Sequence, residues 1–120
     1  MSDIDTIKAL DAAIIAGINA KDADQTTAPY AADGAIFPPG APKMAGTDAI
    51  RGYWQAAIDA GLSDVTSAIT SASVAGDSGV TEGTLAGVMG DQALTGKYVL
   101  TFARTGDGWK VTRDIWNFDA

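Results

Sequence analysis

The sequence contains no cysteine and no histidine. Without cysteine there can be no disulfides, thiolate metal sites or cysteine nucleophiles. Without histidine, Ser-His-Asp catalysis and histidine-ligated zinc are excluded. Any acid–base chemistry therefore has to use Asp, Glu, Tyr or Lys, and neither a metal nor an organic cofactor is expected.

Basic residues and long apolar runs are also scarce. Lys and Arg number 8 against 15 Asp and Glu, so the net charge is −7. Because an acidic surface repels phosphate, we expect no binding to nucleic acid or to anionic membranes. No apolar run is long enough to span a bilayer, and the first residues lack the basic start and apolar core of a signal peptide. The expected location is the cytoplasm.

Two segments resemble ligand-binding motifs but lack residues that those motifs require. Asp22 and Asp24 resemble the start of a calcium loop, but Thr27 stands where that loop needs glycine. The segment 90–97 resembles a phosphate loop, but five residues separate its glycines instead of four, and Tyr98 follows the lysine. Helix capping and an ordinary strand explain these segments.

The chain is long enough for one domain, residues 1–120, and its 47% hydrophobic content indicates a folded core. Three helices are predicted in its first half. Isoleucines recur on one face of the first helix, Asp11 interrupts that stripe, and Gly17 permits close packing. The expected caps are Ser2 or Asp3, Asp22 with Gln25, and Thr47, and the expected ends lie near Ala20, Tyr30 and Gly61.

The strands follow a different pattern. A turn at 32–34 and a short strand at 35–37 are predicted before Pro38, and residues 38–46 are expected to form a loop at a pocket mouth. From Leu62 onwards, β-branched residues and regularly spaced turns predict four antiparallel strands, with bulges or bends at Gly83, Gly87 and Gly96. Helices first and one bent sheet after give an α+β fold, with the helices on one face. The predicted strands are 65–74, 80–89, 92–104 and 109–118, with the turn between the last two at 105–108.

The last strand carries the best candidate for chemistry, Asp114. Side chains alternate along a strand, which assigns Thr112, Asp114, Trp116 and Phe118 to one face and Val111, Arg113, Ile115 and Asn117 to the other. If Tyr98 pairs with Asp114 or Trp116, then Tyr98, Leu100 and Phe102 join the Asp114 face. A slip of one residue would exchange the faces of one strand.

Burial among aromatic side chains would raise the pKa of Asp114 towards neutrality and make it a proton acceptor. Tyr98 or Tyr30 could then donate to the developing enolate oxygen. Glu82, in mid-strand, is a second candidate acid. The structural alternative is that these acids form ion pairs with Arg51, Lys97 or Arg113, or accept a hydrogen bond at a helix end.

Several stretches together resemble the nuclear transport factor 2-like (cystatin-like) superfamily, and in particular its SnoaL-like and ketosteroid-isomerase-like bacterial members. They are Tyr30-Ala-Ala-Asp-Gly-Ala-Ile-Phe-Pro-Pro39, Gly46-Thr-Asp-Ala-Ile50, Gly76-Asp-Ser-Gly-Val-Thr-Glu-Gly83, Gly96-Lys-Tyr98 and Gly108-Trp-Lys-Val-Thr-Arg-Asp-Ile-Trp-Asn117. The resemblance implies a cone-shaped α+β barrel that holds a ligand inside, and a homodimer formed through the open face of the sheet. Some similar members are described as related to the association domain of calcium/calmodulin-dependent kinase.

One position departs from the isomerase pattern. Pro38 falls where steroid isomerases carry their catalytic aspartate, and proline has no proton to move. Steroid isomerisation is therefore not expected, while Asp114 matches the pocket acid that several cyclase-like and isomerase-like relatives keep.

The leading hypothesis is a pocket protein for a small, largely apolar molecule. If it is an enzyme, it is a cofactor-independent isomerase, cyclase or lyase that uses Asp114 and Tyr98. The alternative is a non-catalytic dimerisation or association module. The expected pocket wall comprises Tyr30, Phe37, Met44, Trp54, Met89, Tyr98 and Trp116, and Glu82 is a further expected ligand-binding residue.

Overall fold

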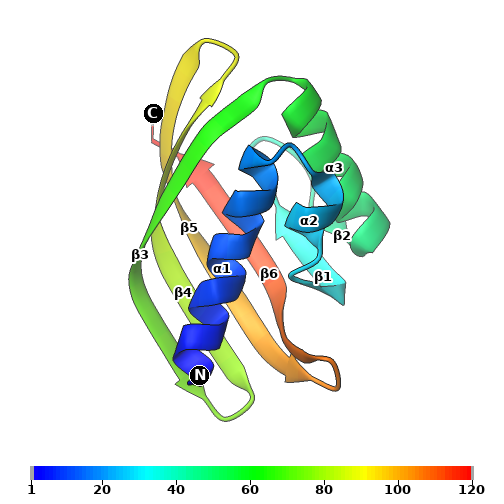
Figure 1. Cartoon of the computed structure of the whole chain (residues 1–120), viewed down its shortest axis with the longest axis vertical. Coiled ribbons are helices and arrows are strands. Elements are labelled where there is room, and N and C mark those ends of the chain that lie inside the picture. The colour runs from blue at the N-terminus through cyan, green and yellow to red at the C-terminus, as the bar shows by residue number, and fades with distance from the viewer. Residues whose placement is uncertain (1, 120) are drawn as a thin grey trace.

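The computed structural model describes residues 2–119, which form three helices and one six-stranded sheet. The helices cover one face of a strongly bent sheet (Figure 1). No helix in the described range is long and apolar enough to cross a membrane. The elements are α1 (Asp3–Asn19), α2 (Ala23–Thr27), β1 (Tyr30–Phe37), β2 (Met44–Ala45), α3 (Thr47–Asp59), β3 (Leu62–Ala75), β4 (Ser78–Met89), β5 (Gln92–Thr105) and β6 (Gly108–Phe118).

The helix caps agree with the sequence except at α3. The Ser2 hydroxyl accepts a hydrogen bond from the Asp5 amide, and the Asp22 carboxylate accepts one from the Gln25 amide. These two caps confirm the predicted starts of α1 and α2. At α3 the prediction of Thr47 is wrong, because Gly46 is the cap, with φ of 92° and no side-chain hydrogen bond.

Strand β1 begins earlier than predicted. Helix α2 was expected to reach Tyr30, but it ends at Thr27, and the Pro29 carbonyl accepts a hydrogen bond from the Val111 amide of β6. The predicted turn at 32–34 is an irregularity inside β1, where the register to β6 shifts between Tyr30 and Ala35. The parallel pairing of β1 with β6 therefore brings Tyr30 into the sheet.

The four-stranded antiparallel meander β3–β6 is confirmed, and the sheet order is β2-β1-β6-β5-β4-β3. The short strand β2 lies inside the predicted loop and pairs with β1. Because β2 and β3 are the two edges, the sheet is open rather than a closed barrel. Gly83, Gly87 and Gly96 are not bulged residues themselves, since the β4–β5 register is continuous there, but the register between β3 and β4 shifts beside Gly83 and opposite Gly87.

The bulges lie in the neighbouring strands instead. Two occur in β3, and one occurs in β6 between Val111 and Arg113. The β6 bulge corrects the predicted faces of that strand, because Thr112 is an extra residue and shifts the alternation by one. Val111 is consequently fully buried on the same side as Asp114 and Trp116.

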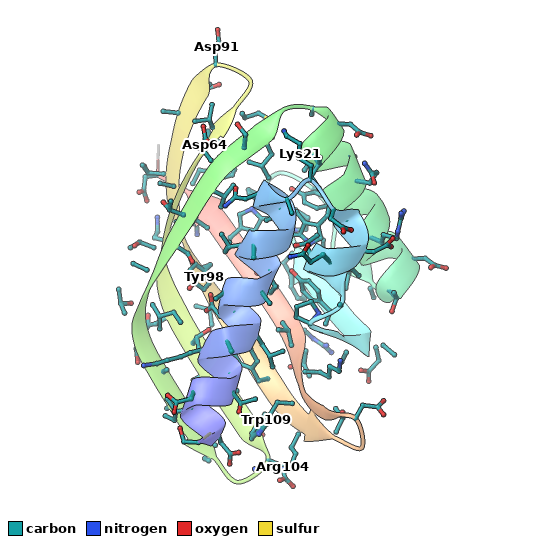
Figure 2. The ribbon with its side chains drawn as sticks, in the orientation of Figure 1. Lys21, Asp64, Asp91, Tyr98, Arg104 and Trp109 are labelled. Atoms are coloured by element: carbon teal, nitrogen blue, oxygen red, sulfur yellow. The ribbon has the colours of Figure 1, made fainter. Side chains whose placement is uncertain are left out.

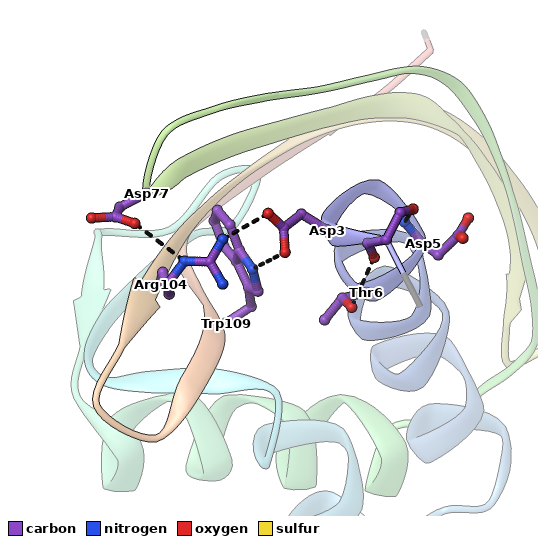
Figure 3. Close-up of polar contacts among 7 residues, drawn as sticks. Asp3, Asp5, Thr6, Asp77, Arg104 and Trp109 are labelled. Atoms are coloured by element: carbon purple, nitrogen blue, oxygen red, sulfur yellow. Dashed lines mark hydrogen bonds and ion pairs between the residues drawn. The ribbon is translucent and has the colours of Figure 1, made fainter.

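Helix α1 is fastened to the sheet at both ends. Asp3 accepts hydrogen bonds from the Arg104 guanidinium at 2.6 Å and from Trp109 Nε1 at 3.1 Å, and Arg104 also pairs with Asp77 (Figure 3). At the other end, the Asn19 amide group bonds to both the N–H and the C=O of Val65. These contacts hold α1 across the sheet, so the position of Asp11 at its middle is well defined.

Candidate functional site

A pocket of about 80 Å³ lies between α1 and the helix-covered face of the sheet. It extends from buried residues at the middle of α1 to the half-exposed side chain of Phe118. Most of its lining is aliphatic or aromatic. The lining residues are Asp11, Ile14, Ile15, Ile18, Trp54, Leu62, Val65, Leu85, Ala86, Gly87, Leu94, Tyr98, Leu100, Asp114, Trp116 and Phe118.

Asp114 lies in this lining and is only 5% exposed. Its neighbours on the two adjacent strands are Leu100 on β5 and Ile36 on β1, and both side chains are apolar. Burial raises the pKa of the Asp114 carboxyl to about 7; the hydrogen bond from Tyr30 lowers it, and the charge of Asp11 raises it. A carboxyl group that titrates near neutrality can both accept and return a proton.

Tyr30 is the direct partner of Asp114. Its hydroxyl donates to Asp114 Oδ2 at 2.6 Å. Burial, followed by the charge of Asp114, holds the pKa of the Tyr30 hydroxyl well above its usual value, so Tyr30 stays a donor. Among residues 2–119, no side chain donates a hydrogen bond to the other oxygen of Asp114, Oδ1.

A second carboxyl group, Asp11, enters the pocket from α1. It is 2% exposed and accepts hydrogen bonds from the Thr81 hydroxyl at 2.8 Å and from the Tyr98 hydroxyl at 2.9 and 3.0 Å. Tyr98 reaches it from β5, beside the middle of α1 (Figure 2). Burial raises the pKa of Asp11, and the bonds from Thr81 and Tyr98 lower it. Sequence reasoning noted Asp11 only as a break in an apolar stripe.

Aromatic rings pack around Asp114 on the α3 side. Trp54 and Trp116 stack with ring centroids 5.3 Å apart, and Tyr53 meets both rings edge-on. Trp116 is placed opposite Tyr98 by the β5–β6 register, which confirms the non-slipped hairpin. Trp54 and Trp116 line the pocket, and Tyr53 packs against them from outside the lining.

The family model of the SnoaL-like domain matches residues 12–116 of the chain, which include Asp114, Tyr98 and both tryptophans of the pocket. The chain belongs to the SnoaL-like domain family. A search of curated proteins found no match.

Solved structures share the fold of this SnoaL-like domain. A ketosteroid isomerase-like protein from Erwinia carotovora atroseptica has a TM-score of 0.88 at 17% identity, with 99% of this chain and 98% of that chain covered. A domain of unknown function with a cystatin-like fold from Nostoc punctiforme has a TM-score of 0.87 at 14% identity, with 98% and 78% covered. A protein from Thiobacillus denitrificans, named as a calcium/calmodulin-dependent protein kinase type II association domain, has a TM-score of 0.78 at 18% identity, with 94% of each chain covered. Identities this low support the fold alone.

The pocket of this SnoaL-like domain is lined by some of the residues predicted from the sequence and not by others. Trp54, Tyr98 and Trp116 line it, and Tyr30 contacts it through Asp114. Phe37 and Glu82 lie outside it, since each is in register with the outward-facing row of the sheet that contains Val99 and Ile115. Met44 in β2 and Met89 at the end of β4 are half-buried and also lie outside the lining.

The cations that could have neutralised Asp114 or Glu82 are engaged elsewhere in the SnoaL-like domain. Arg51 pairs with Asp24, Lys97 pairs with Asp119, and Arg113 donates to a backbone carbonyl. Within the described range, no group of three His, Cys, Asp or Glu side chains is placed to hold a metal ion. Asp114 and Asp11 are therefore held in place by hydroxyl groups and not by cations.

Proposed function

We propose that the protein binds a small, largely apolar molecule between α1 and the sheet and that Asp114 transfers a proton on that molecule. The observation that carries this proposal is the Asp114 carboxyl group, which lines an apolar pocket, has no cationic partner within residues 2–119 and keeps Oδ1 without a protein donor. Burial places its pKa at about 7, so both protonation states are populated near neutral pH.

The chemistry this supports is that of an isomerase, cyclase or lyase without a cofactor. The ionised Asp114 accepts a proton from an acidic C–H bond, and the bonding electrons stay on the ligand. In an isomerase or cyclase the proton returns to another atom, whereas in a lyase the electrons expel a leaving group. Tyr30 holds the carboxylate in place through its bond to Oδ2.

Pocket size argues for a small ligand. At about 80 Å³ the pocket is well below the roughly 300–1,000 Å³ typical of sites for drug-sized molecules. In the isomerase-like pattern that this sequence resembles, Pro38 also stands where steroid isomerases carry their catalytic aspartate. A steroid substrate is therefore not proposed.

A thermal-shift screen with small apolar carbonyl compounds tests the proposal. Ligands that fit should raise the melting temperature of the wild-type protein and of Glu82→Gln, which removes one exposed charge outside the pocket. Leu94→Trp, which enlarges a half-buried lining residue, should abolish the shift. Turnover of any hit should fall by about a hundredfold or more in Asp114→Asn, and equal turnover in both proteins would sink the catalytic role.

We also propose that two copies of the chain associate through the outer face of the sheet. Phe37, Ile115 and Val99 lie side by side in register on β1, β6 and β5, and Ile115 is 51% exposed. The helices cover the opposite face (Figure 1). A contiguous apolar row on an uncovered sheet face is typical of an interface. Association by itself, without catalysis, is the second candidate function, and the name of the Thiobacillus relative is consistent with it.

A further inference from the structure

We propose that the ligand of this pocket carries a positive charge on nitrogen: it is a small ammonium or iminium ion with an apolar body. This inference rests on the proposed function, because it names the class of molecule that Asp114 receives.

When Asp114 is ionised, the pocket offers a ligand hydrogen-bond acceptors and no free donor. Asp11, Tyr98 and Asp114 supply its carboxyl and hydroxyl groups. Each tyrosine hydroxyl has a single hydrogen; Tyr98 donates it to Asp11 and Tyr30 donates it to Asp114. The Nε1–H of Trp54 has no partner, but it is buried without accessible surface and so does not face the ligand. A negative charge developing on a carbonyl oxygen would therefore find no hydrogen bond here while Asp114 itself acts as the base.

The acidic groups of the pocket have no counter-charge among its lining residues. Two carboxyl groups, Asp11 and Asp114, share a cavity whose lining includes no lysine or arginine. The tyrosines whose pKa values burial and the charge of Asp114 raise come from three elements: Tyr30 from β1, Tyr53 from α3 and Tyr98 from β5. All of them are neutral and supply no counter-charge. A cationic ligand would supply the missing counter-charge and offset the cost of burying an ionised carboxylate.

The geometry gives this cation one preferred place. Oδ2 of Asp114 is bonded to Tyr30, and both oxygens of Asp11 are bonded to Tyr98 or Thr81. Asp114 Oδ1 is the carboxyl oxygen left for an N–H of the ligand. The apolar body would then lie along the aliphatic lining formed by Ile14, Ile18, Leu62, Leu85 and Leu94.

An iminium ion also removes the need for an oxyanion donor in the proposed proton transfer. In the reactive pose Asp114 Oδ1 accepts the proton of the carbon next to the C=N⁺ group in place of the ligand N–H, while Oδ2 stays bonded to Tyr30. The C–H electron pair becomes a C=C bond, and the π pair of the C=N⁺ bond becomes the lone pair of a neutral enamine nitrogen. Charge is conserved, since one carboxylate and one cation become a carboxylic acid and a neutral molecule. The positive nitrogen accepts the electrons that a carbonyl would need hydrogen-bond donors to accept.

The experiment compares matched amines and alcohols of increasing size: butylamine with butanol, cyclopentylamine with cyclopentanol, and cyclohexylamine with cyclohexanol. Binding is measured by calorimetry and by thermal shift on the full chain. At about pH 8.5, where Asp114 is ionised, each amine that fits should bind about tenfold more tightly than its alcohol, as expected for a charge-assisted hydrogen bond.

The two series should also respond to pH in opposite directions. Lowering the pH to about 5.5 protonates Asp114, whose pKa is about 7, and should weaken amine binding while the alcohols bind as well or better. This comparison needs no variant, so it remains decisive if a substituted protein does not fold. Asp114→Asn should remove the preference for amines, and Glu82→Gln, with the same charge change on an exposed residue, should keep it.

Each other result overturns a defined part of the proposal. Alcohols that bind as tightly as amines, with binding blocked by Leu94→Trp, would refute the cationic class while the proposed pocket function stands. An amine preference that survives Asp114→Asn would place the cation away from Asp114 and refute the assignment. If neither the amines nor the alcohols bind, both this inference and the proposed small-molecule function are refuted.

Discussion

At the scale of single residues, Asp114 should control how stability depends on pH. Its pKa in the folded protein, about 7, lies above the ordinary value of about 4, so the folded state binds more protons than the unfolded state between these values. Stability should therefore fall as the pH rises from about 4 to about 7. Asp114→Asn should be more stable than the wild type at about pH 8 by about 2–4 kcal/mol and similar to it at about pH 4. Urea unfolding across this range measures the difference.

Two comparisons make that measurement specific. Glu82→Gln removes an exposed carboxylate and should follow the wild-type pH profile. Asp11 has a pKa raised by burial, so it contributes in the same direction and Asp114→Asn should keep part of the slope. A wild-type stability that stays level or rises between about pH 5 and pH 8 would contradict the raised pKa of Asp114.

The two carboxyl groups of the site differ in how far the sequence reveals them. Asp114 stands among aromatic residues on an alternating strand, so its local pattern predicted a buried acid. Asp11 is visible as a polar interruption of a helical apolar stripe, but its partners Thr81 and Tyr98 are 70 and 87 residues away in the sequence. Only the crossing of α1 over β4 and β5 brings them together. The spacing of apolar residues along α1 cannot show which strands the helix crosses.

At the scale of elements, the packing of α1 against α2 depends on Gly17. A Cβ at this position would lie 2.3 Å from the backbone nitrogen of Thr26, which is too close for any adjustment of a side chain to relieve. Gly17→Ala should therefore destabilise the protein by about 2 kcal/mol or more. Gly52, in α3, has open space around its Cβ position, and Gly52→Ala should stabilise by about 0.5–1 kcal/mol through helix propensity. Urea unfolding of both variants measures these opposite effects, and equal effects would contradict the close approach.

The sequence predicted elements well where their hydrogen bonds are local and less well where they are not. The four strands of the meander pair with their neighbours in the chain, so alternation and turn residues located them. Strand β1 pairs in parallel with β6 from the far end of the chain, and the Ala32–Gly34 segment was interpreted as a turn because glycine and aspartate favour turns. The bulge at Thr112 has no distinctive residue, so the face of Val111 was assigned incorrectly.

At the scale of the whole molecule, β6 connects the pocket with the outer face of the sheet. Asp114 and Trp116 point to the pocket, and Ile115 between them points outward beside Val99 and Phe37. An interface on the outer face would restrict the motion of β6. Association would therefore help to hold Asp114 in place even though no residue of a second copy needs to enter the pocket.

Substitution of Ile115 tests whether that association occurs. Ile115→Lys places a charge at the centre of the outer apolar row, where burying it against a second copy without a counter-charge would be costly. The wild type should sediment as a dimer at micromolar concentration, and Ile115→Lys should shift the population to monomer by about a hundredfold or more in dissociation constant. Ala56→Lys, which adds the same charge on the exposed side of α3, should remain dimeric.

A monomeric wild type, or an Ile115→Lys variant that dimerises as well as the wild type, would show that the outer row is not the interface. Because Ile115 points away from the pocket, the monomeric variant should still bind the amine probes, which separates the role of the outer face from that of Asp114.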